Sequence, residues 1–233
     1  MEKTLPTTTA AIPANSSKTV ILNAPWQEAK LWWPQEDPAV MYTLRAKISS
    51  SGKTADVYDQ SFGFREVKID GKYIRINGLR RNFWNLLSGF QGDTDAQKLE
   101  HFYKGNNRLE RFSSDIGDQI GYKDRTQQLD WADKHGIAGR LSTMVDGMFI
   151  TYTLENPVVW ENFQEHIEQV IKNNRNHPSV IVYSLENELL MINGTCIHGP
   201  QEMDKIEDSA YKYLAIPAKN LDPTRPTMLD GGG

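Results

Sequence analysis

The sequence is poor in cysteine and has no long apolar run. Cys196 is the single cysteine among 233 residues, so the chain cannot form an internal disulfide or a cysteine-based metal cluster. No apolar run approaches the roughly 18 residues that cross a bilayer, and residues 1–18 lack the apolar segment of a secretion signal. The compartment is therefore open: cytoplasmic, or secreted or periplasmic if the natural chain begins earlier. The glycosylation sequon at Asn193 has meaning only in a secreted protein.

The sequence also lacks a block of basic residues and the short motifs that hold phosphates or metals. Its net charge of −4 excludes the basic surface typical of proteins that bind nucleic acids or anionic membranes. No glycine-rich phosphate loop follows a predicted strand, and the sequence has no His-Glu-x-x-His motif. We therefore expect no cofactor, no metal ion, no nucleic acid and no membrane partner.

The first third of the chain is typical of β structure. Residues 18–23, 40–48 and 55–64 are rich in β-branched and aromatic residues, and they alternate in part between apolar and polar. Turn residues at 49–52 separate the second run from the third. A β-sandwich needs about seven strands, so these three strands predict only part of one.

From about residue 67 the pattern changes to strands that alternate with helices. Short apolar runs predict strands, and apolar residues at helical spacing behind a capping residue predict helices. The expected strands are 73–76, 83–87, 107–112, 137–144, 179–185 and 226–229. The expected helices are 94–105, 124–135, one that begins after Asn156, and 201–221 with a bend at Pro217. This alternation predicts a parallel sheet, either open or closed into a barrel.

The segment most informative about chemistry is SLENE, at residues 184–188, where a buried strand is expected to end. Polar residues at the carboxyl ends of barrel strands line active sites, so Glu186, Asn187 and Glu188 are candidates. Side chains alternate along a strand, so Glu186 and Glu188 should point to the same side unless the strand breaks there. The alternative is that these carboxylates are the solvated cap of a following helix.

Residues 176–188, NHPSVIVYSLENE, resemble the signature of glycoside hydrolase family 2, in which a strand after Asn-His-Pro ends in Ser-x-x-Asn-Glu. Other segments resemble the same family in the same order: LWWP at 31–34, GFRE at 63–66 and DKHGI at 133–137. The resemblance covers roughly residues 20–233. Within the family, Trp32-Trp33-Pro34 resembles slightly more the β-mannosidase-like or glucosaminidase-like members, and β-galactosidase and β-glucuronidase stay open.

The resemblance implies an α/β fold with two parts. The larger part is a partial (β/α)8 TIM barrel, containing about the first five strands, and a partial all-β immunoglobulin-like sandwich precedes it. We expect residues 1–17 to be a disordered or residual N-terminal segment, residues 18–66 the sandwich and residues 67–233 the barrel. Part of a barrel leaves two strand edges without a neighbour, which favours self-association; the oligomeric state itself is not predicted.

For function, the resemblance implies a retaining glycosidase that acts on terminal β-linked sugars and takes a β-glycoside as its partner. Such enzymes use two carboxyl groups about 5–5.5 Å apart, one as acid/base and one as nucleophile. Glu188 falls on the family's acid/base, and Asn187 falls on the residue that binds the sugar 2-hydroxyl. Trp84 is a candidate sugar platform, although packing is the commoner role of such a residue.

Two departures from the family pattern bear on function. The family's nucleophile follows the seventh barrel strand, whereas this sequence reaches about the fifth, so we expect the chain alone to be inactive. Glu110 stands where the family has an active-site arginine, with Arg108 and Arg111 nearby, which leaves the sugar-contacting arginine unassigned. A non-catalytic carbohydrate-binding or interaction fragment is therefore the alternative function.

Overall fold

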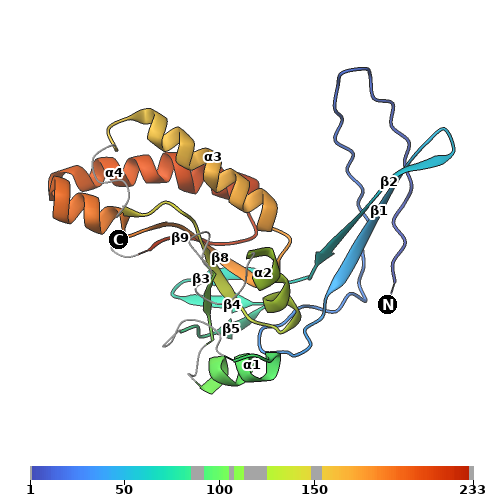
Figure 1. Ribbon diagram of the computed structural model, residues 1–233, viewed down its shortest axis with the longest axis horizontal. Helices are drawn as coiled ribbons and strands as arrows, with labels where there is room; N and C mark the ends of the chain where they lie inside the picture. Colours follow the sequence, from blue (N-terminus) through green and yellow to red (C-terminus); the bar gives the residue numbers. More distant parts are fainter. Residues whose placement is uncertain (1, 85–91, 105–107, 113–124, 148–153, 231–233) are drawn as a thin grey trace. The chain divides into compact units, whose positions relative to one another are not determined.

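The computed structural model describes residues 2–84, 92–104, 108–112, 125–147 and 154–230 (Figure 1). The chain divides into two units, Met1–Lys30 and Leu31–Gly233. None of the described helices is long and apolar enough to cross a membrane.

The described part of the first unit contains no helix or strand, so the strand expected at residues 18–23 is wrong. Val20 and Ile21 are 45% and 77% exposed, which shows that this apolar run buries little of its surface. A strand needs a neighbour to accept and donate its backbone hydrogen bonds, and no described strand pairs with this run.

The first strands of the second unit form an antiparallel hairpin of β1 (Tyr42–Ser50) and β2 (Lys53–Phe62). The predictions at residues 40–48 and 55–64 are therefore confirmed to within a few residues. Ser51 and Gly52 both have positive φ values in the connecting turn, as tight hairpin turns require. Most residues of the hairpin are exposed.

A second antiparallel sheet is formed by β3 (Val67–Asp70), β4 (Tyr73–Ile76) and β5 (Leu79–Arg81). Of these strands, the sequence predicted only β4. Val67 and Ile76 are buried in a small core with Trp32. The same core contains Ala138, Ile181 and Val182, which lie near the amino ends of the parallel strands described next. The antiparallel sheet therefore packs under the amino edge of the parallel sheet.

The parallel sheet contains β6 (Glu110–Phe112), β7 (Gly139–Ser142), β8 (Val180–Asn187) and β9 (Thr227–Asp230), in that order. All neighbouring pairs are parallel, which confirms the predicted alternation of strands and helices. Part of the strand expected at residues 83–87 lies outside the described residues, and its described residues are not in a strand.

The long helices begin where their capping residues predict. In α3 (Pro157–Asn174), the Asn156 side chain accepts a hydrogen bond from the Val158 amide at 3.0 Å. Before α1 (Asp95–Lys104), Thr94 and Gln97 bond each other's backbone amides. These contacts are an N-cap and a capping box, which satisfy amides that a helix leaves free at its start.

The remaining helical segments differ in detail from the sequence prediction. They are α2 (Arg125–Lys134), a π-helical segment (Leu190–His198), a short 3-10 turn (Pro200–Glu202), α4 (Met203–Ala210), a second π-helical segment (Tyr211–Ala215) and α5 (Ile216–Leu221). The π-helical segment directly before α5 marks the irregularity expected at Pro217. The segment Leu190–His198 was not predicted.

The main core lies between the helices and one face of the parallel sheet. Trp160, Ile167 and Ile171 of α3 pack there with Tyr183 and Leu185 of β8. Helix α3 lies beside the later helical segments (Figure 1). Helices cover the apolar face of the sheet, and the antiparallel sheet covers its amino edge. The carboxyl edge is covered by neither, and it is the edge where polar side chains are found.

Candidate active site

Glu188 is the first residue after the carboxyl end of β8. It is half-buried, and its φ of 55° lies in the left-handed region. Its N–H donates to the carbonyl of Asp230 at 2.6 Å, and its own carbonyl accepts from Ile192 N–H at 2.9 Å. The strand therefore breaks at Glu188, with the backbone of this residue held on both sides.

Asn187 is the last residue of β8, and its side-chain amide is held at both ends. Its Oδ1 accepts from Arg111 Nη2 at 2.8 Å, and its Nδ2 donates to Asp146 Oδ2 at 2.8 Å. A guanidinium only donates and a carboxylate only accepts, so the two partners fix which way the amide faces. The amide is half-buried, and its second N–H and second lone pair are suited to a hydroxyl-bearing ligand.

Arginines from two strands tie this edge together. Arg111 of β6 donates from Nε to Ser142 Oγ at 3.1 Å and lies 3.9 Å from Asp230. Arg140 of β7 forms an ion pair with Asp230 of β9. The result is a polar network across the carboxyl ends of all four parallel strands.

Glu186 lies in a different environment from Glu188, although both come from the same strand end. Glu186 is 2% exposed. Its Oε1 accepts from Asp230 N–H at 2.7 Å and its Oε2 from Leu189 N–H at 2.6 Å. Burial raises the pKa of the Glu186 carboxyl to about 7; the two backbone hydrogen bonds oppose this rise, and the Asp230 and Asp146 carboxylates add to it. Its carboxyl therefore binds backbone groups inside the protein.

Trp84 lies at the other edge of the sheet. Its carbonyl accepts from Arg108 N–H at 2.9 Å, and Arg108 precedes the amino end of β6, whereas Glu188 follows the carboxyl end of β8. The structure thus does not bring Trp84 together with Asn187 and Glu188, and its role as a sugar platform stays a prediction. Trp84 instead lines a cavity of about 210 Å³, together with Pro34, Gln35, Arg80, Arg81, Asn82, Phe83 and Arg108.

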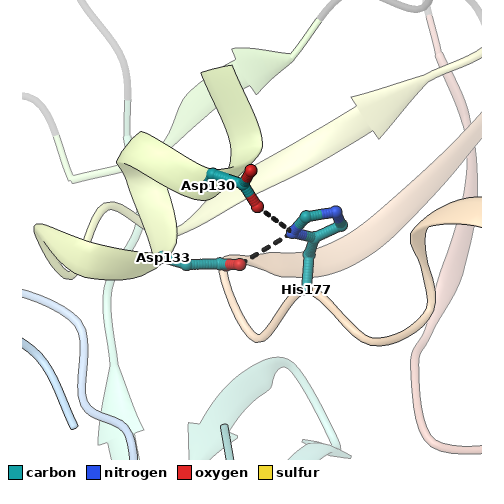
Figure 2. Close-up of side chains that lie close together, drawn as sticks. All are labelled: Asp130, Asp133 and His177. Atoms are coloured by element: carbon teal, nitrogen blue, oxygen red, sulfur yellow. Dashed lines mark hydrogen bonds and ion pairs between the residues drawn. The ribbon is translucent and has the colours of Figure 1, made fainter. Parts of the chain in front are cut away.

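Asp130, Asp133 and His177 form the cluster, within the described residues, whose side-chain atoms lie close enough to hold a cation (Figure 2). His177 Nδ1 lies 2.7 Å from Asp133 Oδ2 and 3.9 Å from Asp130 Oδ1. The other Asp133 oxygen accepts from Ser179 N–H at 2.9 Å. Since both Asp133 oxygens have hydrogen-bond partners, the cluster acts as a joint between α2 and the turn before β8.

The sequon residue Asn193 is fully buried. Its side-chain amide donates to the Gly147 carbonyl at 3.3 Å. Glycosylation requires this amide to be exposed, so the folded protein does not offer the sequon for modification.

Asp146 and Asp230 were not identified as site residues from the sequence, and Arg111 was named there without an assigned role. Each lies in or just after a predicted strand, so the strand-end rule applied to Glu188 could have found them. Their roles depend on partners from other strands, and the spacing in the sequence does not give those partners.

Parallel strands with helices on one face and polar side chains at the carboxyl edge are consistent with part of a β/α barrel. The model of the TIM barrel domain of glycosyl hydrolases family 2 matches residues 65–233, and a second model of family 2 matches residues 2–65. The chain belongs to glycosyl hydrolases family 2. The resemblance drawn from residues 176–188 is confirmed, as is the expected order of a sandwich domain followed by a TIM barrel.

Relatives from the family include β-galactosidases and β-glucuronidases. The chain is 25% identical over 213 residues to the β-galactosidase of Alteromonas mediterranea, covering 86% of this chain and 18% of that protein. It is 26% identical to the β-glucuronidase of Sus scrofa, covering 85% of this chain and 30% of that protein. The chain thus spans about a fifth to a third of the length of these relatives.

Solved structures agree on the fold. The β-glucuronidase of Bifidobacterium dentium, complexed with coumarin-3-O-glucuronide, superposes with a TM-score of 0.64 at 25% identity. The match covers 87% of this chain and 32% of that one. The β-glucuronidase of Dictyoglomus thermophilum superposes with a TM-score of 0.61 at 22% identity, covering 87% of this chain and 35% of that one.

Proposed function

We propose that the chain is part of a retaining glycosidase that hydrolyses O-glycosidic bonds of terminal β-linked sugars. Glu188 is the proton donor, and Asn187 binds the sugar 2-hydroxyl. The observation that carries this proposal is the geometry at the end of β8: a half-buried Glu188 on a fixed backbone, beside an amide that Arg111 and Asp146 orient. The names of the family relatives support the reaction class.

Protonation is needed because an alkoxide is a poor leaving group, and Glu188 supplies the proton to the glycosidic oxygen as the bond breaks. A retaining enzyme also needs a carboxylate that attacks the anomeric carbon from the opposite face. Asp146 and Asp230 are bound to Asn187 and Arg140, which suits them to orienting roles. The family resemblance places the nucleophile on a later strand, so we expect negligible turnover by this chain alone.

We propose that the substrate is a β-galactoside or a β-glucuronide, which are the substrate classes in the names of the relatives. β-Mannosides and β-glucosaminides complete the panel to be tested. We also propose a domain boundary at residues 66/67, which the start of β3 at Val67 and the hairpin before it support. The boundary at residues 17/18 stays a prediction from the sequence.

The experiment supplies a nucleophile from solution, in place of the carboxylate that the family resemblance puts on a later strand. The chain is incubated with formate and with β-glycosides of two leaving groups, phenyl (poor) and dinitrophenyl (good). We expect slow, formate-dependent cleavage that gives the inverted glycosyl formate. Because only the poor leaving group needs a proton, Glu188→Gln should slow the phenyl glycoside at least about a hundredfold and the dinitrophenyl glycoside little.

The control is Glu207→Gln, which removes an exposed carboxylate of α4 and should change neither rate. Equal loss with both leaving groups would contradict proton donation by Glu188. Formate-independent turnover with retained anomeric configuration would show that a carboxylate of this chain serves as the nucleophile. Saturable sugar binding without any cleavage would favour a non-catalytic carbohydrate-binding fragment.

A further inference from the structure

The buried carboxylate of Glu186 binds backbone groups on two different elements. Its Oε2 accepts from the amide of Leu189, the residue that directly follows Glu188, at 2.6 Å. Its Oε1 accepts from the amide of Asp230 at 2.7 Å. The carbonyl of Asp230 in turn accepts from Glu188 N–H at 2.6 Å. The Glu186 side chain is thus linked to the backbone of Glu188 in two ways. One link is through the next residue, Leu189, and the other is through Asp230, whose carbonyl binds Glu188 N–H.

The backbone that these bonds hold is one that glutamate rarely adopts. Glu188 has φ at 55°, and a left-handed conformation is unfavourable for a residue with a Cβ because the Cβ approaches the following carbonyl oxygen. Such a conformation persists only when its surroundings determine it. Gly147 is part of those surroundings, because a Cβ at this position would overlap the carbonyl oxygen of Glu188.

We propose that Glu186 is a positioning residue, which fixes the left-handed backbone of Glu188 through the amides of Leu189 and Asp230 and so sets the direction of the Glu188 side chain. The catalytic consequence rests on the proposed function of Glu188. The geometric part, that Glu186 holds this backbone, does not depend on it.

The charged groups around Glu186 make this contact sensitive to pH. Asp230 faces it from β9 and Asp146 from the segment after β7, and both carboxylates disfavour its ionised form. Arg140 and Arg111 contact the Asp230 carboxylate, so they influence Glu186 only through Asp230. When Glu186 is protonated, the oxygen that carries the hydrogen is a weaker acceptor than a carboxylate oxygen, so one of the two backbone hydrogen bonds is weakened.

The test begins with the unmutated chain, labelled with ¹⁵N. We expect the amide resonances of Leu189, Asp230 and Glu188 to move together as pH is varied through about 7. In Glu186→Gln the amide nitrogen of the side chain replaces one acceptor, so this joint titration should vanish. Glu207→Gln, the matched exposed control, should leave it intact.

The same variants are then assayed with formate and the phenyl β-glycoside. We expect Glu186→Gln to lower the rate at saturating substrate by roughly tenfold to a hundredfold, because a misplaced catalytic group loses about that much. KM should change less than about twofold, because Asn187 keeps its partners Arg111 and Asp146. If Glu186 were needed only for folding, its substitution would not lower the rate at saturating substrate while leaving KM nearly unchanged.

The outcomes distinguish the two proposals. If Glu188→Gln has no effect on the phenyl glycoside, the proposed function fails, and the amide titration still decides whether Glu186 holds the backbone. If Glu188 controls the rate but Glu186→Gln behaves as Glu207→Gln does, the positioning role is overturned. Amides of Leu189 and Asp230 that keep their chemical shifts in Glu186→Gln would overturn it without reference to the assay, because these two amides bind the Glu186 carboxylate.

Discussion

Glu186 and Glu188 show how far two identical side chains on one strand end can differ. Glu186 is buried against backbone amides, whereas Glu188 is half-buried after the strand has broken. Sites that carry out acid–base chemistry commonly place neighbouring carboxyl groups in different environments. Here the strand breaks at Glu188, where φ is positive, and the two carboxyl groups therefore differ in burial.

The raised pKa of Glu186 predicts a specific dependence of stability on pH. Its folded pKa of about 7 lies above the ordinary pKa of 4.5 for this carboxyl group, so between these pH values the folded state keeps a proton that the unfolded state releases. The free energy of unfolding should therefore fall as pH rises through this window, by up to roughly 3 kcal/mol. Urea denaturation of the unmutated chain and of Glu186→Gln measures it; a pH-independent difference between them would contradict the prediction.

Gly147 provides a second test at the residue scale. A methyl group at this position would overlap the carbonyl of Glu188, so Gly147→Ala should lower the free energy of unfolding by roughly 1–3 kcal/mol. The amide resonance of Glu188 should shift as its backbone is displaced. Chemical denaturation and NMR measure both effects, and a variant within about 0.5 kcal/mol of the parent chain would show that the close approach is not needed.

At the scale of elements, the contact between Asp133 and His177 joins α2 to the turn that starts β8. Asp133 is almost fully buried, and its oxygens bond His177 Nδ1 and Ser179 N–H. Trp32 donates to the Asp133 carbonyl at 2.8 Å, which brings a third segment to the same point. This joint sets where β8 begins, and therefore where the residues at its other end lie.

Asp133→Ala should lower the free energy of unfolding by about 2–4 kcal/mol, because it leaves buried polar groups without their partner. Asp130→Ala, the exposed neighbour in the same cluster, should cost about 0.5 kcal/mol or less. Thermal or urea denaturation of both variants provides the comparison. A large rise in melting temperature on adding Zn²⁺ or Mg²⁺, lost in both variants, would show instead that the cluster binds a cation.

At the scale of the whole molecule, burial is uneven within the unit Leu31–Gly233. The parallel sheet and its helices share one core, and the small core around Trp32 lies at the amino edge. Most residues of the β1–β2 hairpin are exposed, and a two-stranded hairpin is marginally stable alone. Local stability should therefore be lowest in this hairpin.

Hydrogen exchange should reveal this difference. Amides of β1 and β2 are expected to exchange at least about tenfold faster than those of β8, since segments with little buried apolar surface open at low free energy. Mass spectrometry of proteolytic peptides or NMR measures the rates. Equal protection of the hairpin and β8 would show that another surface covers the hairpin in solution.

The sequence by itself determined the elements that depend on neighbours along the chain. Helix α3 followed from the Asn156 cap and its apolar spacing, and β8 followed from a continuous apolar run. The family signature at residues 176–188 identified Glu188 and Asn187 as candidates. Caps, periodicity and apolar runs are local properties, so a chain can be read for them before it is folded.

Only the tertiary structure decided which side chains meet at the carboxyl edge. The short strands β3 and β5 pair with β4 and were not predicted, and residues 18–23 have strand character without forming a strand. The contacts of Asn187 with Arg111 and Asp146, and of Glu186 with Asp230, join residues 41 to 76 positions apart. Parallel strands bring such residues together because their carboxyl ends share one edge, and the breaking of β8 at Glu188 depends on partners that only the folded sheet supplies.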